Sequence, residues 1–162
     1  MPQKPSNPPL KRHPNLVPLS HDHHDSLVFA LRIKKYITKV DHKIMQQYIL
    51  HHWESVMKNH FKEEEGCFLS VVDPQHELIV HFTEDHKAIR EYIRQLGTDS
   101  PDFEKIARAF SEKLNQHIRF EERQLFPFLQ EHLSDQQLEA IGHALSHKTN
   151  GCDNFPNPFW KK

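Results

Sequence analysis

The distribution of proline constrains the fold of this chain more than any other feature. Six of its 11 prolines lie in residues 2–18, and residues 19–73 contain none. A proline inside a helix removes a hydrogen bond and clashes with the preceding turn, so a stretch without proline is free to be helical. The four glycines and the scarcity of β-branched runs also favour helix over strand. Residues 2–18 show no apolar periodicity, which predicts an extended or disordered leader.

Capping residues and apolar side chains at helical spacing predict where the first three helices lie. We expect Ser20 to cap the first helix and Asp41 to cap the second, because short polar side chains satisfy the free N–H groups of a helix start. Asp73 followed by Pro74 is expected to open a third helix, which Gly97 would close.

The second half of the chain carries the same signals. Ser100-Pro101 repeats the pairing of a cap with a proline at the first helical position, and it predicts a fourth helix. Pro127 should kink or end that helix. Ser134 is expected to cap a short fifth helix.

These elements predict an all-α protein with an up-down-up-down four-helix bundle, a short C-terminal helix and irregular tails, because short connections force neighbouring helices to run antiparallel. The expected segments are a leader over residues 1–18, the bundle over 19–149 and a tail over 150–162. The apolar residues of the tail are expected to fold back onto the bundle; they are Phe155, Phe159 and Trp160.

Composition excludes several classes of function. Lys and Arg total 21 against 22 for Asp and Glu, so the formal net charge of −1 argues against a nucleic-acid-binding protein. The longest apolar run, residues 27–31, is too short to span a bilayer, and the polar start of the chain lacks the apolar stretch of a secretory signal. Two cysteines cannot form a disulfide framework, which predicts a cytoplasmic location.

Histidine is abundant, with 15 copies, and some of them belong to a duplicated motif. His60-x-x-x-Glu64 and His117-x-x-x-Glu121 are each followed by a further glutamate, two more residues and a pair of large apolar residues. Residues at positions i and i+4 lie on one face of a helix, so each motif can direct an imidazole and a carboxylate to the same point.

Each motif is preceded, one helix earlier, by a histidine next to acidic residues. In the second half this residue is His86. In the first half both His23 and His24 are candidates; we expect His24, because it precedes Leu27 by three residues as His86 precedes Ile89. Each half of the protein would then contribute two imidazoles and one carboxylate.

Four imidazoles and two carboxylates are the components of a dinuclear metal site in a bundle core, in which each carboxylate is free to bridge both ions. Such ligands suit iron or manganese and, less distinctively, zinc; without clustered cysteines a thiolate site is not expected. Burial of six such groups without a cation would be costly. The alternative is that these are surface histidines beside a solvated glutamate run.

The doubled motif, over roughly residues 19–132, resembles the hemerythrin-like family, also called the histidine-histidine-glutamate (HHE) cation-binding domain. The resemblance implies a four-helix bundle with a non-haem di-iron centre, its two iron ions bridged by an oxo or hydroxo group, with manganese or zinc as alternatives. The implied ligands carry over to His24, His60, Glu64, His86, His117 and Glu121, with both glutamates bridging the ions.

The resemblance implies a protein that binds, senses or handles O2, NO or iron. Oxygen-carrying hemerythrins have two histidines four residues apart on the third helix, whereas Phe82 and Arg90 flank His86 here at that spacing. The ligand pattern is similar to that of iron–sulfur cluster repair proteins, so a di-iron enzyme of redox or repair type is an alternative. A metal-free helical interaction domain is another.

No general acid or nucleophile stands out from the ligand set, so we predict no catalytic residue and favour binding or sensing over catalysis. A small diatomic ligand is the expected partner; nucleic acid and membrane are not, and no protein partner is predicted.

Glu65 and Glu122 follow the ligand glutamates and should point about 100° away, either to solvent or to the back of a ligand. Cys67 is expected to be a buried structural residue, and His81 to be exposed. Surface or packing roles are expected for His51, His52, His132, His143 and His147.

Overall fold

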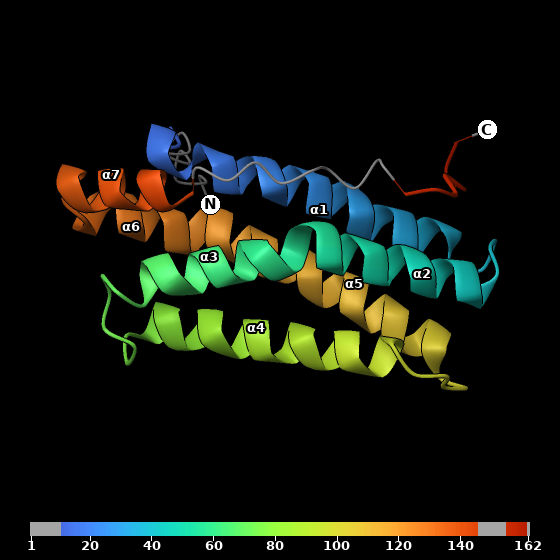
Figure 1. Ribbon diagram of the computed structural model, residues 1–162. Coiled ribbons are helices and arrows are strands. Elements are labelled where there is room, and N and C mark those ends of the chain that lie inside the picture. Colours follow the sequence, from blue (N-terminus) through green and yellow to red (C-terminus); the bar gives the residue numbers. More distant parts are fainter. Residues whose placement is uncertain (1–10, 146–154, 162) are drawn as a thin grey trace, which may run out of the picture.

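The computed structural model describes residues 11–145 and 155–161, and within these ranges it contains helices and no strand (Figure 1). The elements are η1 (Pro14–Leu16), α1 (Val17–Tyr36), α2 (His42–His52), η2 (Trp53–Met57), α3 (Lys58–Phe68), α4 (Glu77–Leu96), α5 (Phe103–Phe120), η3 (Glu121–Leu125), α6 (Phe126–His132) and α7 (Asp135–Ala144). The prediction of an all-helical protein is confirmed.

Long helical rods lie side by side in the described part of the chain (Figure 1). They are α1, the continuous run α2–η2–α3, α4, and the continuous run α5–η3–α6. Helix α5 contacts both α1 and α4, and α4 also contacts α2 and α3. The short helix α7 packs on η1 and α3 at one end of this helical bundle. No helix in the described ranges is long and apolar enough to cross a membrane.

Three of the predicted helix boundaries are confirmed. The Asp41 carboxylate accepts a hydrogen bond from the N–H of Lys43 at 2.7 Å and caps α2. Gly97 follows the last residue of α4. Ser134 and Gln137 form a reciprocal capping box at the start of α7, with bonds of 3.1 and 2.9 Å.

The expected start of the first helix at Ser20 is wrong. Helix α1 begins at Val17 and includes Pro18 in its first turn. A proline is tolerated there because the first N–H groups of a helix have no partner within it. Residues 14–18, which the predicted division assigns to the leader, are therefore helical, and Leu16 is fully buried.

The third and fourth helices begin later than predicted, because the expected caps close short turns instead. The Asp73 carboxylate accepts from the N–H of Gln75 at 2.9 Å, and α4 begins only after His76, whose Nδ1 accepts from Leu78 N–H at 3.2 Å. Ser100 Oγ accepts from the N–H of Asp102 at 3.1 Å, ahead of α5.

Two π-helical turns, η2 and η3, keep their rods continuous. In η3 the N–H of Phe126 bonds to the carbonyl of Glu121, five residues back. Pro127 follows directly, in the first turn of α6. The fourth rod does not end at Pro127 but continues to His132, with its hydrogen-bond pattern shifted by one residue.

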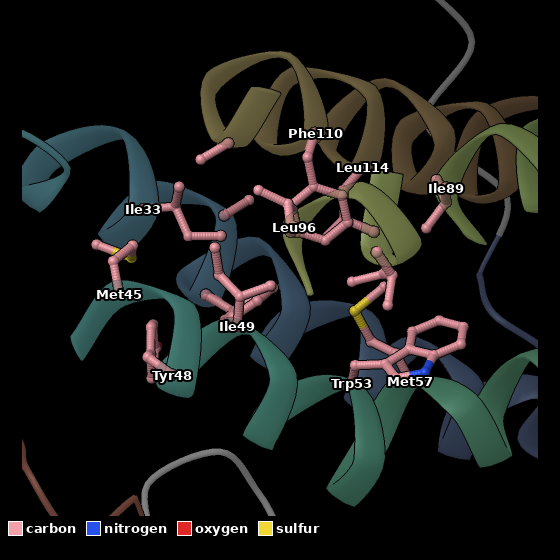
Figure 2. Close-up of a cluster of buried hydrophobic side chains, with 14 of the residues drawn as sticks. Ile33, Met45, Tyr48, Ile49, Trp53, Met57, Ile89, Leu96, Phe110 and Leu114 are labelled. Atoms are coloured by element: carbon pink, nitrogen blue, oxygen red, sulfur yellow. The ribbon is translucent and has the colours of Figure 1, made fainter. Parts of the chain in front are cut away.

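The apolar interior falls into two clusters of buried side chains. One, drawn in Figure 2, joins α1, α2, η2, α4 and α5 through residues such as Ile33, Ile49, Trp53, Ile89 and Phe110. The other joins α1, α3, α4, η3, α6 and α7 and includes Leu19, Phe68, Phe82, Phe126 and Ile141. The buried aromatic side chains of the bundle include Trp53, Phe61, Phe82, Phe110 and Phe120.

The described part of the tail packs on the bundle as expected. Phe155 is buried and lies 5.3 Å from the ring of Tyr48, measured between centroids. Phe159 contacts Tyr36 and Tyr48, and the Arg32 guanidinium lies 4.2 Å from the Trp160 ring. The rest of the predicted tail and the first ten residues lie outside the described ranges.

Candidate metal centre

All four rods contribute a histidine to one buried cluster between the two apolar clusters. The residues that meet there are His23 on α1, His60 and Glu64 on α3, His86 on α4, His117 on α5 and Glu121 at the start of η3. Each has a relative exposure of 4% or less, and both glutamates are fully buried. Five of the six predicted ligands are therefore brought together.

The sixth, His24, is not part of the cluster: its side chain is exposed, while His23 is 3% exposed and faces inward. The spacing to Leu27 favours His24 in the sequence, but Leu27 is only half-buried. The buried positions three and seven residues after His23 are Ser26 and Ala30, which are not large apolar residues.

A repeated dipeptide in the sequence distinguishes the inward-facing histidine. Asp22 directly precedes His23, just as Asp85 directly precedes His86. Each aspartate contacts the back of a histidine on another helix, as described below. This pairing aligns the two halves of the chain better than the apolar residues do.

The ligand atoms form two groups of four. One group is His23, His60, Glu64 and Glu121, and the other is His86, His117, Glu64 and Glu121; within each, the atoms lie within 4.8 Å of one another. The Nε2 atoms face the carboxylates: His60 lies 3.0 Å from Glu64, and His23 lies 3.1 Å from Glu121. Both glutamates belong to both groups.

Each histidine uses its other ring nitrogen to contact a carboxylate outside the cluster. The Nδ1 distances are 3.0 Å from His23 to Glu122, 2.9 Å from His60 to Asp22, 2.9 Å from His86 to Glu65 and 3.0 Å from His117 to Asp85. A carboxylate accepts from Nδ1–H, which leaves the Nε2 lone pair directed into the cluster and makes it more basic.

These contacts resolve one prediction and add two residues. Glu65 and Glu122 were expected either to face solvent or to support a ligand, and both do the second. Asp22 and Asp85 had no role assigned from the sequence, although the repeated Asp-His pair was visible there. The contact pattern is the same in both halves: Asp22 and Glu65 correspond to Asp85 and Glu122.

The unpartnered atoms of the cluster test whether cations fit it. Both carboxylate oxygens of Glu64 and of Glu121 are buried without a hydrogen-bond partner, as is Nε2 of His86. The Nε2 atoms of His23 and His60 face each other at 3.2 Å. Buried acceptors in this arrangement are stable only if positive charge lies among them, so the residues fit a pair of divalent cations.

The pKa values describe the same negative field. Burial alone would lower the pKa of His60, but Glu64 and Asp22 outweigh burial and raise it to about 9. For His86, burial is outweighed by the nearby carboxylates of Glu121, Glu64 and Glu65, which raise its pKa to about 10. Protons and metal ions therefore compete for these imidazoles.

Phenyl rings enclose the cluster. Phe61 stacks on His86 with ring centroids 3.8 Å apart, and Phe126 stacks on His23 at 5.4 Å. Phe82 lies 4.1 Å from the ring of His86. Trp53 and Phe61 form a T-shaped pair with ring centroids 5.6 Å apart. These rings shield the cluster from water.

The remaining candidates lie outside the two groups. Cys67 is buried as expected, and burial together with Glu63 and Glu64 raises the pKa of its thiol. His81 is exposed and stacks on Phe120. His52 has a packing role: it is fully buried and stacks on Phe29. His132 and His143 are exposed, His51 is half-buried, and His147 lies outside the described residues.

The fold and this cluster define a helical-bundle protein whose interior is suited to metal cations. The model of the hemerythrin HHE cation-binding domain family matches residues 15–129, and the chain belongs to this family. Comparison with curated proteins and with solved structures found no match.

Proposed function

We propose that this chain is a non-haem di-iron protein that binds or senses a small diatomic ligand, O2 or NO. His23 and His60 would hold one iron, His86 and His117 the other, and Glu64 and Glu121 would bridge both. The observation that carries the proposal is that both glutamates belong to both groups of ligand atoms. The proposal includes an up-down-up-down order of the four rods and a cytoplasmic location.

The ligand chemistry favours iron. Imidazole with carboxylate suits iron and manganese better than the soft metals, and no cysteine belongs to either group of ligands. Zinc is less favoured, because structural zinc sites are usually four-coordinate and single. When bound, iron would supply reversible ligand binding and one-electron chemistry to the cluster.

The side chains around the ligands support binding or sensing more than catalysis. The groups nearest the ligands are carboxylates occupied by Nδ1–H bonds and phenyl rings. The carboxylates fix the imidazole orientations, and the rings keep water out, which suits a small uncharged ligand. Each ion would have four protein ligands, which leaves coordination positions for that ligand.

Metal analysis of protein produced without a histidine tag tests the proposal. We expect two irons per chain when the protein is purified from iron-supplied cells. The optical spectrum of the ferrous protein should change on exposure to O2 and, in a separate anaerobic sample, to NO. A protein that takes up no metal would contradict the proposal and favour the helical interaction domain.

A further inference from the structure

Two arginines, one in each half of the protein, bind carboxylates that contact the Nδ1 atoms of two ligand histidines. Arg90 on α4 binds both oxygens of Glu65, at 2.5 and 3.0 Å, and Glu65 contacts Nδ1 of His86. Arg12 places Nη2 2.9 Å from Glu122, which contacts Nδ1 of His23. Arg90 belongs to a bundle helix, whereas Arg12 precedes η1 in the N-terminal segment.

Arg12 also binds the backbone at the π-turn. Its Nη2 donates to the main-chain carbonyl of Glu122 at 2.8 Å. In the hydrogen-bond pattern of η3 the donor for that carbonyl would come five residues later, from Pro127, which has no N–H. Arg12 therefore satisfies a carbonyl that the proline leaves free, in addition to the Glu122 side chain.

The segment that carries Arg12 is tied to α6 through one side chain. Gln130 Oε1 accepts from Nη1 of Arg12 at 2.9 Å and from the N–H of His13 at 3.1 Å. Its Nε2 donates to the carbonyl of Lys11 at 3.0 Å. Residues 11–13 thus have a defined position against the fourth rod.

A second line of contacts connects the arginines to the same histidines. The Arg12 guanidinium lies 5.2 Å from the centre of the Phe126 ring, and that ring stacks on His23. In the other half, Arg90 lies 5.6 Å from the Phe61 ring, which stacks on His86. Each arginine thus reaches its histidine through both a glutamate and a phenyl ring.

We infer that Arg12 is a positioning residue for the metal centre and that the N-terminal segment controls one of its two metal positions, the one formed with His23. Without Arg12, the partly exposed Glu122 is free to turn to solvent, and the His23 ring loses the acceptor that fixes it. The backbone of Arg90 is fixed in a bundle helix beside Glu65, whereas Arg12 leaves Glu122 when a short segment detaches. Metal binding and attachment of the segment therefore stabilise each other.

This inference rests on the proposed function, and Fe²⁺ titration of the full apo protein under anaerobic conditions tests it. Arg12→Gln should weaken one of two Fe²⁺ binding steps by about 10–100-fold and leave the other at the wild-type value. Arg90→Gln should weaken one step equally, and the double variant should weaken both. Lys11→Gln, which removes an exposed charge from the same segment, should bind as wild type, and Arg12→Lys should recover part of the loss.

A second readout follows the segment itself. Hydrogen exchange of the amides of residues 14–20 should slow when Zn²⁺ is added to wild type, and not in Arg12→Gln. Two wild-type steps in Arg12→Gln would overturn the inference and leave the di-iron proposal standing. Equal weakening of both steps would indicate a general loss of stability and would also overturn it. A wild-type protein that takes up neither ion would overturn the proposed function, and the inference with it.

Discussion

The adjacent residues His23 and His24 have opposite surroundings, which makes them a matched pair for testing the ligand set. His23 is buried against Glu121 and His60, and His24 is exposed. We expect His23→Ala to retain one metal ion per chain, and His24→Ala to retain two. Metal analysis of the two variants decides this, and loss of metal only from His24→Ala would mean that the first rod is rotated by one residue.

The shared carboxylates should behave differently from the unshared histidines. Glu64→Gln keeps the side-chain volume but removes an anionic oxygen from both groups of ligands, as does Glu121→Gln. Either variant should lose both irons or hold two that no longer couple magnetically, as measured by metal analysis and Mössbauer spectroscopy. Glu63→Gln, which lies outside both groups, is the control and should keep two coupled irons.

The buried side chain of His52 should make the stability of the fold depend on pH. Burial, with His51 and Arg32 nearby, lowers its pKa to about 3, against about 6.5 in the unfolded chain. Because the pKa of His52 is lower in the folded protein, its contribution to stability is fully present above pH 6.5. The free energy of unfolding should fall by about 2 kcal/mol between pH 6.5 and pH 5. Urea unfolding of the apo protein at both pH values, compared with His52→Phe, measures this. Equal losses in both proteins would show that His52 does not titrate as described.

The helices themselves show which parts of the fold the sequence could predict. Asp41, Gly97 and Ser134 act locally, and their caps were predicted correctly. The starts of α4 and α5 were predicted too early, because Asp73 and Ser100 can cap a turn as readily as a helix. A local signal gives the type of an element more reliably than its first residue.

The π-turns could not be predicted from the sequence, because the insertion of one residue into a helical turn depends on packing against the neighbouring rods. The inward orientation of His23 could not be predicted for the same reason. The i and i+4 rule places His60 beside Glu64 within one helix, but the facing of α1 depends on contacts across helices, such as that of Asp22 with His60. Spacing along one helix carries no information about those contacts.

Metal binding should hold the four rods together, since the ligands come from α1, α3, α4, α5 and η3. A metal at about a thousand times its Kd stabilises the folded state by about 4 kcal/mol, and each kcal/mol shifts Tm by about 2–4 °C for a chain of this size. A chelator should therefore lower Tm by about 10 °C. His117→Ala should lower it more than the exposed His143→Ala; small, equal effects would contradict a structural role for the metal.

In the molecule as a whole, the two halves repeat their chemistry more faithfully than their backbone. Each supplies an Asp-His pair and a His-x-x-x-Glu-Glu motif. In both motifs an arginine binds the second glutamate. The π-turns fall at different places, before His60 in one half and at Glu121 in the other. The site constrains the positions of a few atoms, and the two halves place those atoms with π-turns at different points along their helices.

Trp53 contacts Phe61, whose ring also stacks on His86, and this contact gives the protein an internal optical reporter. Bound iron should quench the emission of this buried indole, while Trp160, packed against Arg32 in the tail, stays bright. Trp53→Phe should therefore abolish the fluorescence change on iron loading, and Trp160→Phe should preserve it. Loading could then be followed in solution by light emission alone, without a chromophore added to the chain.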